Sequence, residues 1–233
     1  MLLRSARSAQ VARDPVHHPV FARYYARASV AAETRAGLAH VRDGLLGGLS
    51  GRVLEVGAGN GLNFAHYPRA VSEVVAIEPE RALRALAVEA ALRAQVPVDV
   101  APGVAEALPV KSEAFDAVVL SLVLCSVRDV PRALAEAMRV LRPGGELRFF
   151  EHGRGGGRVM RLTQRALDRT VWPLLAGGCH LARDPVGALR EAGFELGPYR
   201  RLMIPEKGPT LPASYCVTGT AWRPVVDTAT GGS

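Results

Sequence analysis

Cysteine is scarce in this chain of 233 residues, and its distribution excludes two kinds of site. Cys125, Cys179 and Cys216 are odd in number, lie far apart and form no C-x-x-C pair. The pattern therefore indicates neither a disulfide framework nor a zinc site, and we expect no metal. Unpaired cysteines are typical of a reducing compartment, so we expect a cytoplasmic protein.

Long apolar runs are also missing. Residues 1–7 lack the apolar core of about 7–15 residues that marks a secretory signal. No run of about 18 apolar residues, the length that a membrane-spanning helix needs, occurs anywhere. We expect a soluble protein without stable membrane insertion.

Lysine occurs only at positions 111 and 207, so the basic character of the chain comes from arginine. The formal net charge is +7 and the isoelectric point is about 9.9. Such a balance permits attraction to nucleic acid or anionic surfaces, but genomic base composition also produces it. The charge alone identifies no partner, and the oligomeric state is left open.

What the chain does contain is an apolar run that ends in three glycines. Residues 53–56 are typical of a strand buried on both faces of a parallel sheet. The bend that follows consists of Gly57, Ala58, Gly59, Asn60 and Gly61. Glycine permits a tight turn and a close approach of the backbone to a ligand. Helix-compatible sequence starts at Leu62, so we expect backbone N–H groups and a helix N-terminus to point at the ligand.

The spacing of the glycines distinguishes between ligands. A dinucleotide-binding fingerprint, G-x-G-x-x-G, requires glycine where this chain has Leu62. The chain instead reads G-x-G-x-G and carries an acid, Glu55, two residues before it. This arrangement resembles the first motif of class I S-adenosylmethionine-dependent methyltransferases. The alternative is a glycine-rich turn without a ligand.

A second acid supports a nucleoside ligand. Residues 74–77 are apolar and lead into Glu78 and Pro79, about 20 residues beyond the glycines. In doubly wound folds an acid at this position accepts hydrogen bonds from the ribose hydroxyls. Glu78 is therefore the predicted ribose ligand, with a solvated glutamate at a strand end as the alternative.

The rest of the chain alternates strands with helices. Strands are expected over residues 53–56, 74–78, 96–100, 115–121, 146–151, 194–203 and 214–223. Helices are expected over residues 21–49, 62–67, 81–95, 131–141, 159–175 and 184–192. This order predicts an α/β fold, a Rossmann-like, doubly wound, mostly parallel seven-stranded sheet with helices on both faces. We expect an N-terminal extension and helical lid over 1–48, the catalytic domain over 49–225 and a disordered tail over 226–233.

Three further segments carry candidate cofactor contacts. Aromatic residues before the first strand can close over a cofactor, which makes Tyr25 or Tyr24 a candidate lid residue; packing in the core is the alternative. Residues 103–109 resemble the adenine-side loop of the same methyltransferases, with Ala105 and Glu106 as candidates. Ser121 and Leu122 end the fourth strand, at the sheet edge where such folds bind ligands.

Four motifs narrow the resemblance. They are Leu122–Val127, Val140–Gly145, Glu151–His152 and Gly178–Leu181. In order and spacing they resemble the methyltransferases related to the ubiquinone and menaquinone C-methyltransferases, and most closely the membrane-associated alkyl-thiol methyltransferases of animals. The resemblance covers about residues 50–200. The thiol enzymes carry an N-terminal membrane-anchoring segment, which we do not expect in this chain, and an Asp where this chain has Glu78.

The chemistry implied by this resemblance needs few catalytic groups. In a methyl transfer from a sulfonium the cofactor carries the activation, and the protein positions and desolvates the nucleophile. His152, at the end of the fifth strand, is the candidate base or orienting residue, with His180 second. Cys125 and Cys179 are read as packing residues rather than nucleophiles. Asp168 is expected to face solvent.

The sequence therefore favours an S-adenosylmethionine-dependent methyltransferase acting on a small, largely apolar acceptor. A thiol is the first acceptor implied by the resemblance, with oxygen, nitrogen or carbon of a small metabolite or quinone precursor as the alternative. A protein that binds the cofactor without catalysis also stays open. Nucleic-acid methylation is disfavoured, because residues 121–126 match no base-methylating motif and no basic run with interleaved aromatics occurs.

Overall fold

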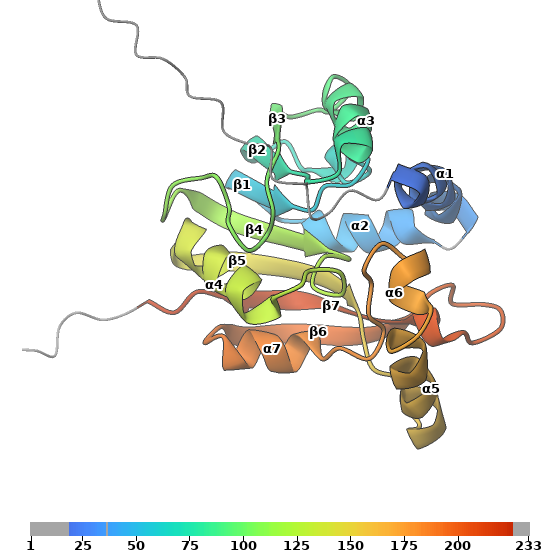
Figure 1. The fold of residues 1–233 in the computed structure, drawn as a ribbon. Helices are drawn as coiled ribbons and strands as arrows, with labels where there is room; N and C mark the ends of the chain where they lie inside the picture. Colours follow the sequence, from blue (N-terminus) through green and yellow to red (C-terminus); the bar gives the residue numbers. More distant parts are fainter. Residues whose placement is uncertain (1–18, 36, 226–233) are drawn as a thin grey trace, which may run out of the picture.

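The computed structural model describes residues 19–35 and 37–225, which form a seven-stranded sheet with helices around it (Figure 1). The strand order is β3-β2-β1-β4-β5-β7-β6, and only β7 runs antiparallel to its neighbours. The strands are β1 (Gly51–Val56), β2 (Val71–Ile77), β3 (Val98–Ala101), β4 (Phe115–Ser121), β5 (Leu141–His152), β6 (Glu195–Met203) and β7 (Tyr215–Trp222). The predicted doubly wound, mostly parallel sheet is confirmed.

Seven helices and two short 3-10 turns are present in the described part of the chain. The helices are α1 (Pro19–Arg35), α2 (Leu38–Leu46), α3 (Arg81–Ala91), α4 (Val130–Val140), α5 (Arg158–Asp168), α6 (Trp172–Leu175) and α7 (Pro185–Glu191). The turns are η1 (Phe64–His66) and η2 (Pro212–Ser214). Residues 1–18 and the predicted tail, 226–233, lie outside the described residues.

Apolar side chains that alternate along the strands build a core on each face of the sheet. Leu54 of β1 packs in a cluster with Leu134 of α4 and Leu189 of α7. Its neighbour Val53 points to the other face, into a cluster with Leu46 of α2. This alternation is the period-two geometry of a strand covered on both faces. It also decides where Glu55 points, since Glu55 shares the face of Val53.

The predicted helix over 21–49 is two helices. α1 ends at Arg35 and α2 begins at Leu38, and the residue between them in the described chain, Gly37, has a φ of +72°. A left-handed residue cannot continue a right-handed helix, so the chain changes direction there. The periodicity of the apolar residues correctly predicts helix on both sides of Gly37, but this glycine divides the helix into two.

The predicted crossover helix from Leu62 is wrong. That segment contains only the turn η1, because Asn63 within it and Asn60 just before it bond to other elements instead of extending a helix. Asn60 Nδ2 donates to Ser29 Oγ at 3.1 Å, and Asn63 Nδ2 donates to Glu55 Oε1 at 2.8 Å. Asparagine side chains commonly compete with helical hydrogen bonding in this way.

The predicted helix over 159–175 also divides, into α5 and α6. Asp168 ends α5, and its carboxylate accepts hydrogen bonds from Leu181 N at 2.7 Å and Ala182 N at 2.9 Å. The expectation that Asp168 faces solvent is therefore wrong: it joins α5 to the loop that precedes α7. Among the described residues, no helix is both long enough and apolar enough to span a bilayer.

Candidate functional site

The glycine bend leaves β1 at the carboxyl edge of the sheet. Gly57, Gly59 and Gly61 have φ values of +69°, +58° and +78°. Gly57 N and Ala58 N both donate to Ile77 O of β2, at 2.7 and 3.1 Å. The bend is thus held against the end of the neighbouring strand, at the edge where parallel sheets bind ligands.

Two of these glycines are required by space as well as by φ. A Cβ atom on Gly57 would lie 2.7 Å from Val123 Cγ2. A Cβ on Gly61 would lie 2.8 Å from both Ala90 Cβ and a ring carbon of Phe64. Distances under 3.0 Å are repulsive for carbon atoms. The sequence pattern therefore reflects close packing of the bend as well as any approach of a ligand.

Glu78 fixes the centre of the bend. Its Oε2 accepts Gly59 N at 2.7 Å and its Oε1 accepts Glu80 N at 2.8 Å. Burial raises the pKa of this carboxyl from 4.5 to about 7, and the two backbone hydrogen bonds oppose that shift. Each carboxylate oxygen accepts more than one hydrogen bond, so these contacts leave acceptor capacity for a sugar diol.

Four of the five backbone donors of the bend are directed at the protein. Gly57, Ala58 and Gly59 donate as described, and Gly61 N donates to Ala58 O at 3.0 Å. With no α-helix following the bend, the expected helix N-terminus is also missing there. The predicted presentation of N–H groups to a ligand is therefore wrong for these four residues and for the helix N-terminus. Side chains and shape must provide most of the recognition.

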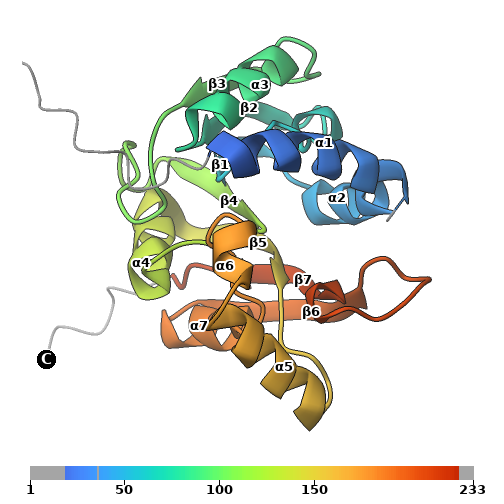
Figure 2. The same cartoon turned by 45° about the vertical axis from the view of Figure 1, so that its right-hand side comes forward.

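α1 lies over the bend, close to the carboxyl end of β1 (Figure 2). A Cβ on Gly59 would lie 3.4 Å from Tyr25 Cε1, so the ring of Tyr25 faces the bend directly. Asn60 Nδ2 donates to Ser29 Oγ of the same helix. Tyr24, by contrast, is 71% exposed. Of the two tyrosines considered as lid residues, Tyr25 is the one at the bend, and burial raises the pKa of its hydroxyl.

Glu55 points away from the bend, into a buried polar network. Its Oε1 accepts Asn63 Nδ2 and its Oε2 accepts Tyr67 Oη, at 2.8 and 2.7 Å. Arg42 of α2 donates to Asn63 Oδ1 and to Glu33 of α1. Burial raises the pKa of Glu55 to about 7. The network connects the helix over the bend to the strand below it, which gives Glu55 a supporting position; direct contact with a cofactor stays a prediction.

The loop after β4 is organised by a carboxylate that the sequence had not marked for this role. Glu151 is fully buried and accepts hydrogen bonds from three consecutive backbone N–H groups, those of Val123, Leu124 and Cys125, at 2.8 to 3.2 Å. Leu122, at the start of the loop, has a φ of +60°. A left-handed leucine is strained, and such strain collects at functional sites. Ser121 is half-buried at the end of β4.

His152 is directed toward β7. Its Nδ1 lies 3.7 Å from Cys216 Sγ, and the carbonyl groups of Tyr215 and Ala213 are also hydrogen-bond partners of the ring. Burial lowers its pKa below 6.5, so the imidazole is neutral at pH 7. These contacts orient the ring; they do not test its predicted role as a base.

His180 and the two loop cysteines lie together. His180 N donates to Cys125 O at 2.7 Å, and its Nδ1 lies 2.8 Å from Gly178 O. The second contact places the proton on Nδ1 and leaves Nε2 as the acceptor. A hydrogen bond with Cys179, together with burial, raises the pKa of Cys125 well above its usual value. A buried, neutral thiol is a poor nucleophile, which agrees with a packing role for Cys125.

The two predicted adenine-side residues, Ala105 and Glu106, have different surroundings in the structure. Ala105 is buried, but the carboxylate of Glu106 turns to the start of α4, where its Oε1 accepts Arg128 N at 2.9 Å and Asp129 N at 3.3 Å. Pro79 O accepts a hydrogen bond from Arg84 at 2.9 Å. Contact of these residues with a cofactor stays a prediction, and Glu106 already has other partners.

A cavity of about 690 Å³ opens beside this edge, between α4 and α7. His152 lines it from the end of β5 and Cys125 from the loop after β4, and Arg183 contributes a guanidinium. Residues of α4 and α7 such as Leu134 and Ala188 supply apolar walls. No residue of the glycine bend lines it. The cavity thus includes the candidate base His152 and is separate from the bend.

The structure therefore brings together Tyr25, the glycine bend and Glu78, and sets Glu55, Glu106 and His152 around them with partners of their own. Sequence reasoning missed Arg42 and Asn63, which nothing in the pattern marks as buried. It also missed the role of Glu151, although Glu151–His152 is one of the four motifs of the resemblance.

Comparison with known proteins agrees with this geometry. Residues 54–149 match the model of a methyltransferase domain. Human thiol S-methyltransferase TMT1A is 38% identical over 155 residues, which cover 63% of this chain and 62% of TMT1A. The ubiquinone/menaquinone biosynthesis C-methyltransferase UbiE of Syntrophotalea carbinolica is 33% identical over 144 residues, 60% of each chain. The chain thus spans less than two thirds of the length of these relatives.

Solved structures show the same fold. The N-methyltransferase NodS from Bradyrhizobium japonicum, in complex with S-adenosyl-L-homocysteine, has a TM-score of 0.59 at 17% identity, over 79% of this chain and 83% of NodS. At this identity the likeness concerns the fold alone. Residues 54–149 thus form a methyltransferase domain, within a chain that has the class I methyltransferase fold.

Proposed function

We propose that this protein is an S-adenosylmethionine-dependent methyltransferase whose acceptor is a small, largely apolar molecule. The observation that carries the proposal is the position of the glycine bend between the ring of Tyr25 and the carboxylate of Glu78. One carboxylate, one aromatic ring and a bend without side chains suit a nucleoside that carries no phosphate.

The residues around the bend fit this cofactor. Glu78 would accept hydrogen bonds from the ribose, and Tyr25 would cover the bend and exclude water. Pro79, Ala105, Ser121 and Leu122 would line the nucleoside, as the resemblance implies. The cofactor, when bound, supplies a methyl group already activated on a sulfonium.

The protein's own contribution is then mainly to hold and desolvate the acceptor. A thiol has a pKa near 8.5 and supplies some thiolate at neutral pH without help. A phenol or a carbon acid needs a base, and His152, whose lowered pKa keeps it neutral, is the candidate. His180, whose Nε2 is left as an acceptor, is the second.

A thiol is the first acceptor to test, because TMT1A is named as a thiol S-methyltransferase. Carbon methylation of a quinone precursor is the second candidate, supported by the similarity to UbiE. Binding of the cofactor without turnover is the remaining alternative. We also infer a cytoplasmic location and no nucleic-acid substrate, supported by the free cysteines and by the absence of a base-methylating motif in the sequence.

The test is to incubate the protein with S-adenosylmethionine labelled on its methyl group and a panel of thiols, phenols, amines and quinone precursors. Both labelled product and released S-adenosylhomocysteine are followed. Methylated thiol would support the first candidate, and a methylated carbon the second. Cofactor binding without product from any class would contradict the proposal in favour of a binding protein.

A further inference from the structure

One exposed surface combines apolar and basic side chains and takes no part in the site described above. We call it the α5–α6 surface; its apolar members are Val159, Leu162, Val171, Leu174 and Leu175. Val159, Leu174 and Leu175 are 78%, 82% and 70% exposed. Large apolar side chains that are scattered singly on a surface need no explanation. Here five of them belong to or flank two helices that follow one another in the chain and contact each other.

Arginines occur on the same helix as Val159 and Leu162. Arg158, Arg165 and Arg169 are exposed, and within the described chain none of them forms an ion pair. Residues seven and eleven positions apart share one side of a helix, so the three make a basic stripe along α5. Val159 and Leu162 fall on the adjoining side. The helix thus presents a basic and an apolar stripe to solvent together.

The inner side of α5 is firmly held, so the exposed residues are not needed for packing. Gln164 is fully buried; its Nε2 donates to Pro212 O at 2.9 Å, and its Oε1 accepts Gly155 N at 2.8 Å. Asp168 anchors the end of the helix to Leu181 and Ala182. An outward position of the apolar side chains is therefore a feature of the fold.

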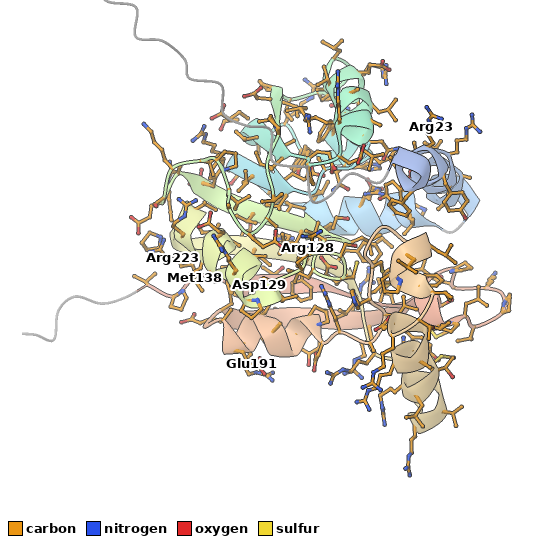
Figure 3. All side chains as sticks on the ribbon, viewed as in Figure 1. Arg23, Arg128, Asp129, Met138, Glu191 and Arg223 are labelled. Atoms are coloured by element: carbon orange, nitrogen blue, oxygen red, sulfur yellow. The ribbon has the colours of Figure 1, made fainter. Side chains whose placement is uncertain are left out.

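The α5–α6 surface projects from the molecule. Figures 1 and 2 show α5 extending away from the sheet beyond the end of β5, with α6 between it and α1. Figure 3 shows nitrogen-tipped side chains gathered around α5. A projecting helix can enter the interface of a bilayer without obstruction by the rest of the protein.

We propose that the α5–α6 surface binds bilayers that carry anionic lipid headgroups. Its apolar residues would enter the boundary between headgroups and acyl chains, while the arginine stripe would contact the phosphates. A second copy of this chain is a poorer occupant, because self-association would bring the two arginine stripes together. No carboxylates lie on the stripe to pair with them.

The test is flotation of the purified full chain with vesicles of phosphatidylcholine containing phosphatidylglycerol, against vesicles of phosphatidylcholine alone. We expect the protein to float with the anionic vesicles only, and less at high salt, which screens the arginines. The double variant Leu174→Glu/Leu175→Glu should bind more than tenfold more weakly. Arg158→Gln/Arg165→Gln should bind about 30-fold more weakly, since each arginine near an anionic surface contributes roughly a fivefold factor.

Matched control variants separate the effect of this surface from a general effect of hydrophobicity or net charge on vesicle binding. Leu92→Glu changes a leucine that is 84% exposed at the C-cap of α3, and Arg93→Gln/Arg190→Gln removes the same charge elsewhere. Both controls should bind within twofold of the wild type. Circular dichroism checks that each variant is folded.

Three outcomes would overturn the proposal. They are a wild-type protein that stays with neither kind of vesicle, α5–α6 variants that bind as the wild type does, and dimers by light scattering that dissociate in the leucine variant without any vesicle binding. The flotation test needs no cofactor and no acceptor, so its failure is distinct from failure of the proposed methyl transfer.

Discussion

The backbone N–H of Gly59 donates to Oε2 of Glu78 at 2.7 Å. This hydrogen bond joins the bend after β1 to the end of β2, and the residue predicted to bind ribose also holds the bend in place. Since Oε1 of the same carboxylate accepts Glu80 N, the side chain has a fixed orientation before any ligand arrives. Such preorganisation reduces the entropic cost of binding.

Replacement of Glu78 by Ala should lower the affinity for S-adenosylmethionine about tenfold or more. The change removes the predicted acceptor of the ribose and frees two buried N–H groups, each of which costs about 1–3 kcal/mol when unsatisfied. Calorimetric titration measures the effect. Glu73→Ala, at the far end of the same strand, is the control and should bind normally. Unchanged affinity in the Glu78 variant would show that the ribose lies elsewhere.

Alanine at the glycines of the bend should destabilise the protein to different extents. Gly57→Ala and Gly61→Ala combine a positive φ with a Cβ that clashes at 2.7–2.8 Å. Gly48→Ala has an equally positive φ, +80°, but no atom within 4 Å, so it should cost only about 1–2 kcal/mol of conformational strain. Urea denaturation compares the three. Equal losses of stability in the three variants would mean that a Cβ atom fits at Gly57 and Gly61 without a clash.

Tyr25 and Tyr24 form a natural pair for testing the lid. Tyr25→Ala removes the ring over Gly59 and should weaken cofactor binding several-fold, about 1–2 kcal/mol on the scale of a lost aromatic contact. Tyr24→Ala removes an exposed ring from the same helix and should leave binding within twofold. Fluorescence or calorimetric titration of both variants decides. A larger effect at Tyr24 would contradict the placement of α1.

Stability should depend on pH through buried carboxyl groups. Burial raises the pKa values of Glu55, Glu78 and Glu151 from 4.5 to about 7. Between about pH 4.5 and 7 the folded protein therefore binds more protons than the unfolded chain. The contribution of these groups to the free energy of unfolding is present at low pH and is lost as the pH rises through about 7.

Glu55→Gln isolates one of these groups, because the amide keeps an acceptor for Asn63 and does not titrate. The free energy of unfolding of this variant should fall less steeply from pH 5 to pH 7 than that of the wild type. Urea denaturation at each pH provides the comparison. A constant difference between the two proteins over this range would show that Glu55 titrates normally.

His152→Ala should slow turnover of a confirmed acceptor and leave the affinity for S-adenosylmethionine unchanged, because no residue of the bend contacts the ring. Its lowered pKa predicts that the rate stays constant from pH 8 down to about 6.5 and falls only below that. Steady-state kinetics at several pH values, with calorimetry beside them, test both points. Wild-type rates in the variant would leave His152 as a residue that packs against Cys216.

The sheet was predictable because its signals are local. Apolar runs such as residues 53–56 and 115–121 are buried on both faces, and helical segments between them leave few topologies open. G-x-G-x-G and Glu78 were likewise found at the correct edge. Their positions follow from short stretches of sequence, because each directly follows an apolar run that forms a strand.

The surroundings of the site were less predictable, since they depend on contacts between distant segments. Arg42 lies 21 positions from Asn63, and Glu151 lies 26 to 28 positions from the N–H groups that it accepts. Nothing in the local pattern tells a buried glutamate from a solvated one. The helix expected after the bend failed for the same reason, because Asn60 and Asn63 found partners in α1 and β1.

The central claim is that the space bounded by Tyr25, the glycine bend and Glu78 holds S-adenosylmethionine. Calorimetric titration of the cofactor into the wild-type protein tests it most directly. The account predicts saturable binding of one molecule per chain. A titration without binding at any concentration of the cofactor would contradict it.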